Sequence, residues 1–325
     1  MIYLLNSGLV TTTNTLIDMC FNSGNFVPTF TILNEIGNPK VCEETNLSNI
    51  WEIKISEIDS YAEKINRNGL CILFLQDQLR ASHSYYVDDW AQRVDMATEL
   101  IQKITTRLVV IGLGVNAFGE SVPEQIAQVI PTLPDSILKF VRSIGLHAVN
   151  IGVRGHITKQ ILKLLHIHNV SVIGCPSNFI RNPHNAIPPY PADPKCMLVG
   201  GSLLPLLAGG TCTVIHIKQD IFDKKTADIT FEAPKTLAEW QHCTIGAECY
   251  RGERVHGTMV ALSCGIPCIN ESADLRAYEM CELLKIPNPY HMLEFEERKT
   301  YLPHNDVYLE LHTQFRTWCA TYLND

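Results

Sequence analysis

Residues 148–173 read AVNIGVRGHITKQILKLLHIHNVSVI, and this stretch decides the fold. Ala148 to Val153 and Ser171 to Ile173 are short β-branched apolar runs, as expected of strands that are covered on both faces. Between them, apolar side chains recur at the spacing of one helix face, at Ile157, Ile161, Leu164 and Leu165. The stretch therefore predicts a strand, a helix and a second, parallel strand joined by a right-handed crossover.

The same alternation of apolar runs and helical periodicity extends from residue 1 to about residue 176. The clearest helix has its apolar side chains at steps of four and three, at Trp90, Val94, Ala97, Ile101 and Ile104. Further strands are predicted at Met1–Leu5, Thr29–Leu33, Trp51–Ile55, Leu70–Leu75 and Leu108–Leu113.

A proline-rich segment, NPHNAIPPYPADP at residues 182–194, divides the chain, because prolines remove backbone donors and prevent a regular helix. We expect a first lobe at residues 1–181, a connection at 182–195, a smaller lobe at 196–304 and a final helix at 305–325. That helix has a bulky stripe and is expected to pack back on the first lobe; the stripe comprises Leu311, Phe315, Trp318 and Tyr322. Strands of the second lobe are predicted at Met197–Val199, Thr213–Ile217, Thr244–Ala247 and Pro267–Ile269. The predicted class is α/β, with two Rossmann-like lobes, mainly parallel sheets and a second lobe reduced in size.

Composition excludes several classes of function. The 325 residues carry a net charge of -8 without a Lys/Arg-rich run, which argues against a nucleic-acid partner. Twelve cysteines without a CxxC pair or a secretory signal indicate reduced thiols, and Cys264 and Cys268 are interpreted as core residues, so neither a metal nor a cofactor is predicted. No apolar run approaches the length that spans a membrane. A cytoplasmic protein is expected, and peripheral contact with a membrane surface stays open.

Residues 250–269, YRGERVHGTMVALSCGIPCI, carry the candidate chemistry. A polar loop with Arg251, Arg254 and His256 precedes a short helix that is almost wholly apolar, and Gly257 leaves room at its first turn. Because the unpaired NH groups and the dipole of a helix N-terminus favour an anion, these residues predict a phosphate or carboxylate site. The alternative is that Arg254 pairs with a glutamate at the surface and that His256 is a satisfied core histidine.

ERVHGTMVALSCGIPCI, residues 253–269, resembles the Arg-x-His-Gly helix and the Ala-Leu-x-x-Gly-x-Pro strand start of the polysaccharide pyruvyltransferase family. Three other stretches are similar to motifs of that family in the same order. They are VVIGLGVNAFG at 109–119, VNIGVRGHITKQILKLLHIHNVSVIGCPSNF at 149–179 and ADLRAYEMCELLKIP at 273–287.

The resemblance implies a fold like that of the GT-B glycosyltransferases, with two lobes that face across a cleft. It also implies transfer of pyruvate from phosphoenolpyruvate to two hydroxyls of one sugar, with release of phosphate. On this reading His256 is the acid or base. The donor would bind to Arg254, Arg154, Gly257 and Arg251. Acceptor contact or support would come from Arg276, Glu279, Asn6 and Gly8. The acceptor would be a sugar or a lipid-linked saccharide, and assembly into a homo-oligomer stays open.

Two features depart from the family pattern. The family often has an Asn-x-Gly-Asp loop after its first strand, whereas residues 6–12 read NSGLVTT without the aspartate, and the second lobe is short. Two rival functions therefore remain. One is a nucleotide-sugar glycosyltransferase, because a helix followed by Gly, Ile, Pro and a strand also occurs in GT-B donor lobes; the other is a catalytically inactive, glycan-binding member of the family.

Overall fold

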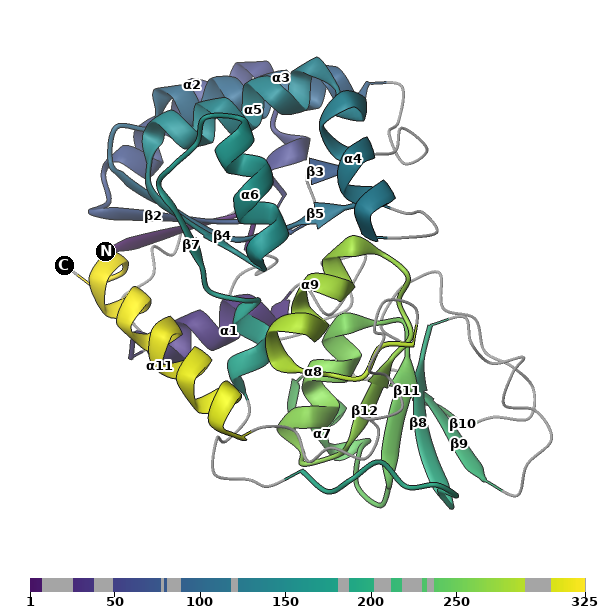
Figure 1. Cartoon of the computed structure of the whole chain (residues 1–325). Coiled ribbons are helices and arrows are strands. Elements are labelled where there is room, and N and C mark those ends of the chain that lie inside the picture. Colours follow the sequence, from purple (N-terminus) through teal and green to yellow (C-terminus); the bar gives the residue numbers. More distant parts are fainter. Residues whose placement is uncertain are drawn as a thin grey trace.

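The computed structural model describes residues 1–7, 26–37, 49–76, 79–80, 89–117, 122–180, 187–201, 212–217, 230–232, 237–289 and 305–324. These residues form two α/β lobes, each built on a five-stranded sheet in which every pairing is parallel (Figure 1). The longest strand of the first sheet has seven residues and the longest strands of the second have five. The predicted α/β class with a smaller second lobe is confirmed.

The first sheet keeps the order of the sequence: β1 (Ile2–Leu5), β2 (Leu70–Phe74), β4 (Arg107–Leu113), β6 (Ala148–Val153) and β7 (Val170–Val172). Right-handed crossovers that all advance in one direction place their helices on the same face of a sheet. The helices on that face are α2 (Ile58–Asn66), α3 (Trp90–Lys103), α5 (Asp135–His147) and α6 (His156–Leu164), seen above the sheet in Figure 1. This topology leaves the opposite face, which is equally apolar, to be covered by other parts of the chain.

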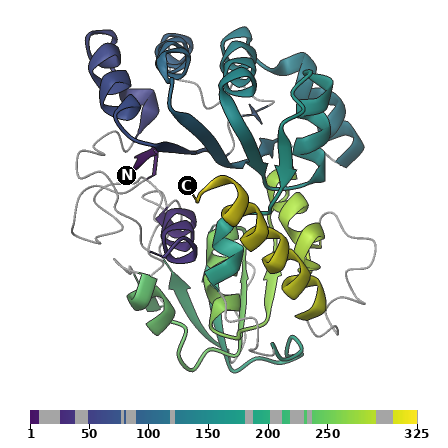
Figure 2. The same cartoon turned by 90° about the vertical axis from the view of Figure 1, so that its left-hand side faces the viewer.

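That opposite face is covered by α1 (Phe26–Glu35), the 3₁₀ helix η5 (Pro176–Ile180) and the last helix, α11 (Asn305–Tyr322), as Figure 2 shows. Phe315 of α11 stacks on Phe179, with ring centroids 4.4 Å apart. Trp318 Nε1 donates a hydrogen bond to Asn150 Oδ1 at 2.8 Å, which ties α11 to β6. Side chains of α8 (Val255–Ser263) and α9 (Leu275–Leu284) belong to the same apolar cluster, so one core continues from lobe to lobe.

The second sheet has a different order: β10 (Thr230–Glu232), β9 (Thr213–Ile217), β8 (Cys196–Gly200), β11 (Cys249–Gly252) and β12 (Cys268–Asn270). In chain order this is 3-2-1-4-5, so the direction of winding reverses between β8 and β11. Ligands of open α/β sheets bind outside the carboxyl ends of the strands at such a reversal. The chain leaves β11 at this point and enters α8.

Ten predicted elements are confirmed within a residue or two: strands β1, β2, β4, β6, β7, β8, β9 and β12, and helices α3 and α6. Strands β3 (Leu79–Arg80), β5 (Val115–Asn116), β10 and β11 were not predicted from the sequence. Arg251, which was expected in a polar loop, lies in β11, paired with Val199 of β8 and Ile269 of β12.

Three predicted strands are wrong. Thr29–Leu33 lies within α1, where the Thr31 hydroxyl bonds back to Val27 O at 2.9 Å and Ile32 packs in the apolar cluster on the first sheet. Trp51–Ile55 forms two 3₁₀ turns, because the Asn49 side chain caps the first of them and Trp51 packs on the rings of Trp90 and Phe140.

The third error is Thr244–Ala247, which is a turn between α7 (Leu237–His242) and β11. Gly246 adopts a positive φ of 85° there, a conformation that suits glycine and ends regular structure. Ile245, whose apolar side chain suggested a buried strand, is 71% exposed.

Replacing Phe315 by alanine tests how much the packing of α11 contributes to the stability of the first lobe. Phe315 has no exposed surface, so Phe315→Ala should lower the free energy of unfolding by about 3 to 5 kcal/mol. Leu309→Ala is the matched control on the same helix, since Leu309 is 37% exposed and should change stability by about 0.5 kcal/mol. Urea unfolding followed by circular dichroism measures both; equal effects would contradict the packing of α11.

Candidate active site

The N-terminus of α8 is fixed at the carboxyl end of β11 by close packing of glycines and a tyrosine. A Cβ at Gly252 would collide with the backbone of Gly200 on the neighbouring strand, and a Cβ at Gly257 would collide with the Tyr250 hydroxyl group. The room that Gly257 was expected to leave for an anion is therefore taken up on this side by Tyr250. That hydroxyl donates to Arg254 O at 3.1 Å, on the residue that precedes the helix. The first turn of α8 is thereby placed where the second sheet reverses its winding.

Arg254 and His256 both lie in this first turn. Arg254 is the N-cap residue, with an extended backbone (φ −82°, ψ 109°), and its side chain does not cap the helix; the first turn contains no acidic residue. The Arg254 side chain is half-buried, and His256 is 6% exposed. The guanidinium and the imidazole are therefore combined with the positive end of a helix dipole in a largely desolvated place, which favours a bound anion.

Arg251, the third predicted cation, is engaged by a carboxylate. Arg251 Nε donates to Glu271 Oε1 at 2.6 Å, and Nη2 contacts the same oxygen. Glu271 follows β12 and is held by its own NH, which donates to Gly252 O at 2.9 Å. Bonding to Glu271 raises the pKa of the guanidinium, and the pair offsets the positive charge that the sequence had suggested for Arg251.

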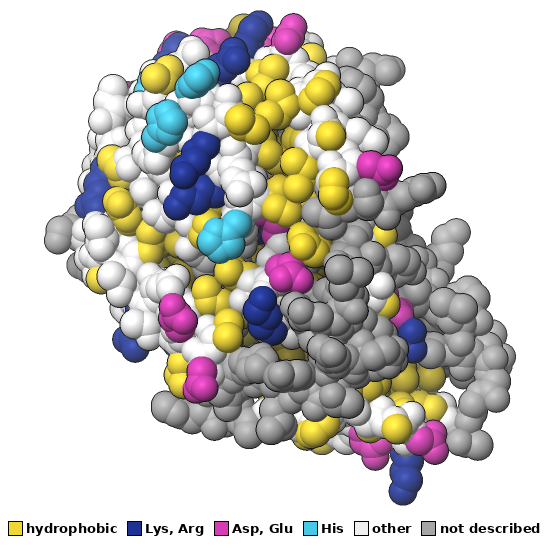
Figure 3. All heavy atoms as spheres, viewed as in Figure 1, with side chains coloured by type: hydrophobic (Ala, Val, Ile, Leu, Met, Phe, Trp, Pro, Cys, Tyr) yellow, Lys and Arg dark blue, Asp and Glu magenta, His cyan; other side chains and the backbone are white. Residues whose placement is uncertain are grey.

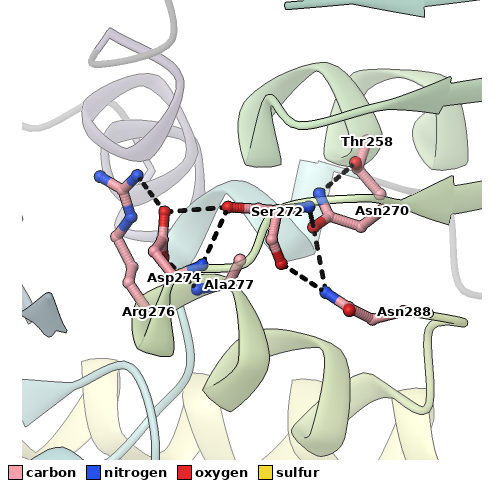
Figure 4. A network of polar contacts seen from close by, with 7 residues as sticks. All are labelled: Thr258, Asn270, Ser272, Asp274, Arg276, Ala277 and Asn288. Atoms are coloured by element: carbon pink, nitrogen blue, oxygen red, sulfur yellow. Dashed lines mark hydrogen bonds and ion pairs between the residues drawn. The ribbon is translucent and has the colours of Figure 1, made fainter. Parts of the chain in front are cut away.

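A buried polar network connects α8 to the segment after β12 (Figure 4). Asn270 Nδ2 donates to Thr258 Oγ1 at 3.0 Å, and Asn270 Oδ1 accepts from Ser272 N at 3.1 Å. Asn288 Nδ2 donates to Ser272 O at 3.0 Å. All four residues are at most 6% exposed, so each bond forms in a low-dielectric interior and losing one would leave a buried polar group unsatisfied.

The same network ends on the N-terminus of α9. Asp274 is the N-cap residue: its Oδ1 accepts from Ala277 N at 2.8 Å, and its Oδ2 accepts from Ser272 Oγ at 2.9 Å and from Arg276 Nη2 at 3.0 Å. Burial raises the pKa of Asp274, but the Arg276 charge and the hydrogen bonds from Ala277 and Ser272 outweigh it, so the net pKa is lowered. Asp274 thus stays ionised, and Figure 4 shows Arg276 held against it.

Glu279, on α9 of the second lobe, reaches the first lobe. Its two oxygens accept from Thr158 N at 2.7 Å and from Thr158 Oγ1 at 2.6 Å, within the first turn of α6. Gly155 makes room for this carboxylate, because a Cβ there would lie 2.5 Å from Glu279 Oε2. Burial raises the pKa of Glu279 to about 7, although the Thr158 hydrogen bonds and the Arg154 charge act in the opposite direction.

Arg154, predicted to bind the donor, lies at the carboxyl end of β6 but is only 1% exposed. Its Nε donates to Gly112 O at 2.9 Å, and its side chain packs against Gly114, where a Cβ would come within 2.9 Å of Arg154 Cδ. The structure therefore brings Arg154 together with Glu279 in the contact between the lobes, where the two opposite charges compensate each other.

Asn6 joins the ends of two strands of the first sheet. Its Nδ2 donates to Phe74 O at 2.7 Å and its Oδ1 accepts from Ile50 N at 3.3 Å, with the backbone in the left-handed region at φ 58°. β1 is three positions from β6 in the sheet, so Asn6 and Arg154 belong to different parts of its edge. Gly8 lies outside the described residues.

Several residues of the site were not found from the sequence. Glu271, Ser272, Asn270 and Asn288 had no recognised signal, and only the folded chain brings their partners together. Asp274 could have been recognised, because an aspartate directly before an apolar helical pattern is a common N-cap.

Within the part of the chain that the structure describes, no three His, Cys, Asp or Glu side chains come together in a way that could hold a metal ion. Cys268 is buried, which raises the pKa of its thiol, and it donates to Ile266 O at 3.2 Å. The described helices include none that is long and apolar enough to cross a membrane.

The segment that contains Arg154, Arg251, Arg254 and His256 matches a known family. Residues 87–272, more than half of the chain, match the family described as Polysaccharide pyruvyl transferase. The chain therefore belongs to the polysaccharide pyruvyl transferase family, and the resemblance found in its sequence is confirmed. Arg276 and Glu279 lie just beyond the matched segment.

No curated protein matches the chain significantly. Among solved structures, a UDP-GlcNAc 2-epimerase from Methanocaldococcus jannaschii is similar with a TM-score of 0.47 and 11% identity, over 96% of this chain and 91% of that one. MnaA of S. aureus, solved with UDP, has a TM-score of 0.45 and 9% identity over 91% and 88%. The glycosyltransferase SnogD from Streptomyces nogalater has a TM-score of 0.33 and 10% identity over 92% and 77%. Likenesses this distant say nothing about the activity of the chain.

The buried Glu279 should make stability depend on pH. Between its ordinary pKa of 4.5 and about 7, the folded state binds the Glu279 proton more tightly than the unfolded state does. The free energy of unfolding of the wild type should therefore fall relative to that of Glu279→Gln as the pH rises through this range, by about 3 kcal/mol in total. Urea unfolding at a series of pH values measures the difference.

Glu282→Gln is the control, since Glu282 lies on the same helix with a third of its side chain exposed and pairs with Lys285. Its unfolding profile should run parallel to that of the wild type. A constant difference between wild type and Glu279→Gln across this pH range would show that the carboxyl group titrates normally.

Proposed function

We propose that this protein transfers pyruvate from phosphoenolpyruvate to a sugar residue of a polysaccharide or of its lipid-linked precursor, forming a pyruvate ketal and releasing phosphate. One observation carries the proposal: Arg254 and His256 lie together in the first turn of α8, at the winding reversal of the second sheet. Membership of the polysaccharide pyruvyl transferase family supports it. The reaction would take place in the cytoplasm and would need neither a metal nor a cofactor.

The donor has the chemistry that this place would recognise. Phosphoenolpyruvate carries a carboxylate and a phosphate monoester, roughly two and a half to three negative charges near neutral pH. A guanidinium binds either group through two parallel hydrogen bonds, and a helix N-terminus favours the same charge. In this proposal Arg254 and the first turn at Gly257 hold the donor. Arg251 and Arg276 are each paired with a carboxylate, so in this proposal they help to hold the site in place and add little attraction of their own.

The proposed reaction requires one group that gives and then takes a proton. His256 first protonates the methylene carbon of the donor, which becomes a methyl group and leaves an electron-poor carbon beside the phosphate ester oxygen. One sugar hydroxyl adds to that carbon and gives its proton back to His256. The C–O bond to phosphate then breaks, and the second hydroxyl adds to complete the ketal. Of the two hydroxyl protons, one ends on the methyl group and the other on the released phosphate, so no water is consumed.

The deciding experiment measures release of phosphate from phosphoenolpyruvate in the presence and absence of candidate sugars. The wild type should release phosphate only with an acceptor. His256→Ala should lower turnover about a hundredfold to ten-thousandfold, the range for the loss of a general acid or base. His242→Ala, on α7 of the same lobe, is the control and should leave turnover unchanged. Turnover of His256→Ala within threefold of the wild type would rule out the catalytic role.

Arg254→Lys tests the donor site separately, because an ammonium group keeps the charge but cannot form a bidentate fork. The dissociation constant for phosphoenolpyruvate, measured by calorimetry, should rise about tenfold or more, since each charged hydrogen bond contributes about 1.5 to 3 kcal/mol. The control is Arg67→Lys, an exposed arginine of the first lobe that pairs with Glu63. Equal dissociation constants for Arg254→Lys and the wild type would refute this contact.

A further inference from the structure

A basic surface lies on the first lobe of this acidic protein. Residues 136–170 contain no Asp or Glu, whereas the whole chain carries a net charge of -8. The same stretch holds five Lys and Arg and four His: Lys139, Arg142, Arg154, Lys159, Lys163, His147, His156, His166 and His168. Apart from the buried Arg154, the four other cations lie in α5 and α6, the two adjacent helices that cover β6 and β7.

These cations lie on the solvent side of the two helices. On α5, Lys139 and Arg142 are exposed at a spacing of three residues; on α6, Lys163 is exposed and Lys159 half-exposed at a spacing of four. Such spacings place side chains on one stripe of a helix. None of the four forms an ion pair with any described residue, and Figure 3 shows Lys, Arg and His side chains gathered over α6. Asp135, at the start of α5 and one turn before Lys139, is the acidic residue that borders this stretch.

Large apolar side chains interrupt the same surface. Leu146 at the end of α5 is 83% exposed, Leu164 at the end of α6 is 66% exposed, and Val149 between them is 45% exposed. The two helix ends adjoin: a Cβ at Gly145 would lie 2.8 Å from the Ile167 side chain, and Asn169 Nδ2 donates to Gly145 O at 3.2 Å. Leu146 and Leu164 thus lie at adjoining helix ends, whose last turns also carry His147 and Lys163.

Cations in the last turn of a helix can be explained by the helix dipole alone. That explanation covers Lys163 and His147, but it gives no reason for two leucines in water beside them. An anionic bilayer binds surfaces on which exposed apolar side chains share helices with Lys and Arg that form no ion pair: the cations meet the lipid phosphates, and the leucines enter the layer below. A nucleic-acid surface would use the same charges but would not need the leucines.

We infer that the ends of α5 and α6, with Lys139, Arg142, Lys159 and Lys163 around Leu146 and Leu164, form a surface that binds an anionic lipid bilayer. The surface is built at the amino-terminal edge of the first sheet, whereas Arg254 and His256 lie at a carboxyl edge of the second. Binding of lipid therefore does not depend on the proposed transfer of pyruvate, and the two can fail separately.

Co-sedimentation of the full chain with vesicles tests this inference. The chain should bind vesicles of equal parts phosphatidylcholine and phosphatidylglycerol but not vesicles of phosphatidylcholine alone, and binding should weaken as salt is added. Removing two cations in the double variant Lys159→Gln, Lys163→Gln should lower the partition coefficient roughly thirtyfold. Leu146→Ser with Leu164→Ser should lower it about a hundredfold, with the charges unchanged.

Matched controls come from the same lobe. The double variant Lys54→Gln, Lys64→Gln removes the same charge from α2 and the turn before it, and Ile55→Ser removes an apolar side chain that is 73% exposed. Both should bind vesicles as the wild type does. The inference is overturned if the wild type fails to bind anionic vesicles, or if the controls lose as much binding as the α6 variant. It is also overturned if the lysine variant loses affinity for duplex DNA while the leucine variant binds vesicles normally.

Discussion

The contact between Glu279 and the first turn of α6 is the constraint on which the placement of the two lobes depends. A carboxylate of the second lobe satisfies the Thr158 NH and hydroxyl of the first, at a helix terminus whose dipole favours negative charge. Glu279 is only 3% exposed, so its carboxylate loses most of its hydration in the folded state. This desolvation raises the pKa of Glu279. Arg154 offsets part of this effect. Leu275 N, one turn earlier on α9, donates to Ala117 O at 3.1 Å, so α9 is held to the first lobe at two places.

The network from Thr258 to Arg276 extends this constraint to the candidate active site. Thr258 is two residues beyond His256 on α8, and Asp274 begins α9, so one set of buried hydrogen bonds fixes both helices relative to β12. Arg251, Arg276 and Arg154 each have a carboxylate beside them, in Glu271, Asp274 and Glu279. The arginines that surround the site are therefore held in place by internal charges.

Much of this architecture could be predicted from the sequence, and the errors have physical reasons. Strands with continuous apolar runs, such as Leu108–Leu113, were predicted correctly because both of their faces are buried. Thr29–Leu33 and Trp51–Ile55 have the composition of strands, but tertiary packing selects a helix and 3₁₀ turns there. Arg254 and His256 could be identified as site residues because they lie two positions apart in one stretch of sequence. The partners of Arg154 and Arg251 could not, because Glu279 and Glu271 approach them only after folding.

The strand order of the first sheet has a consequence for how the chain folds during synthesis. All five strands and the helices on one face precede residue 173, so that half of the lobe can form early. The part of its other face that α11 covers stays open until α11 has been made, after the entire second sheet. A partly synthesised chain thus displays a broad apolar surface, of the kind that chaperones bind and that promotes aggregation. The ribosome must add the whole second lobe before Phe315 and Trp318 can close that face.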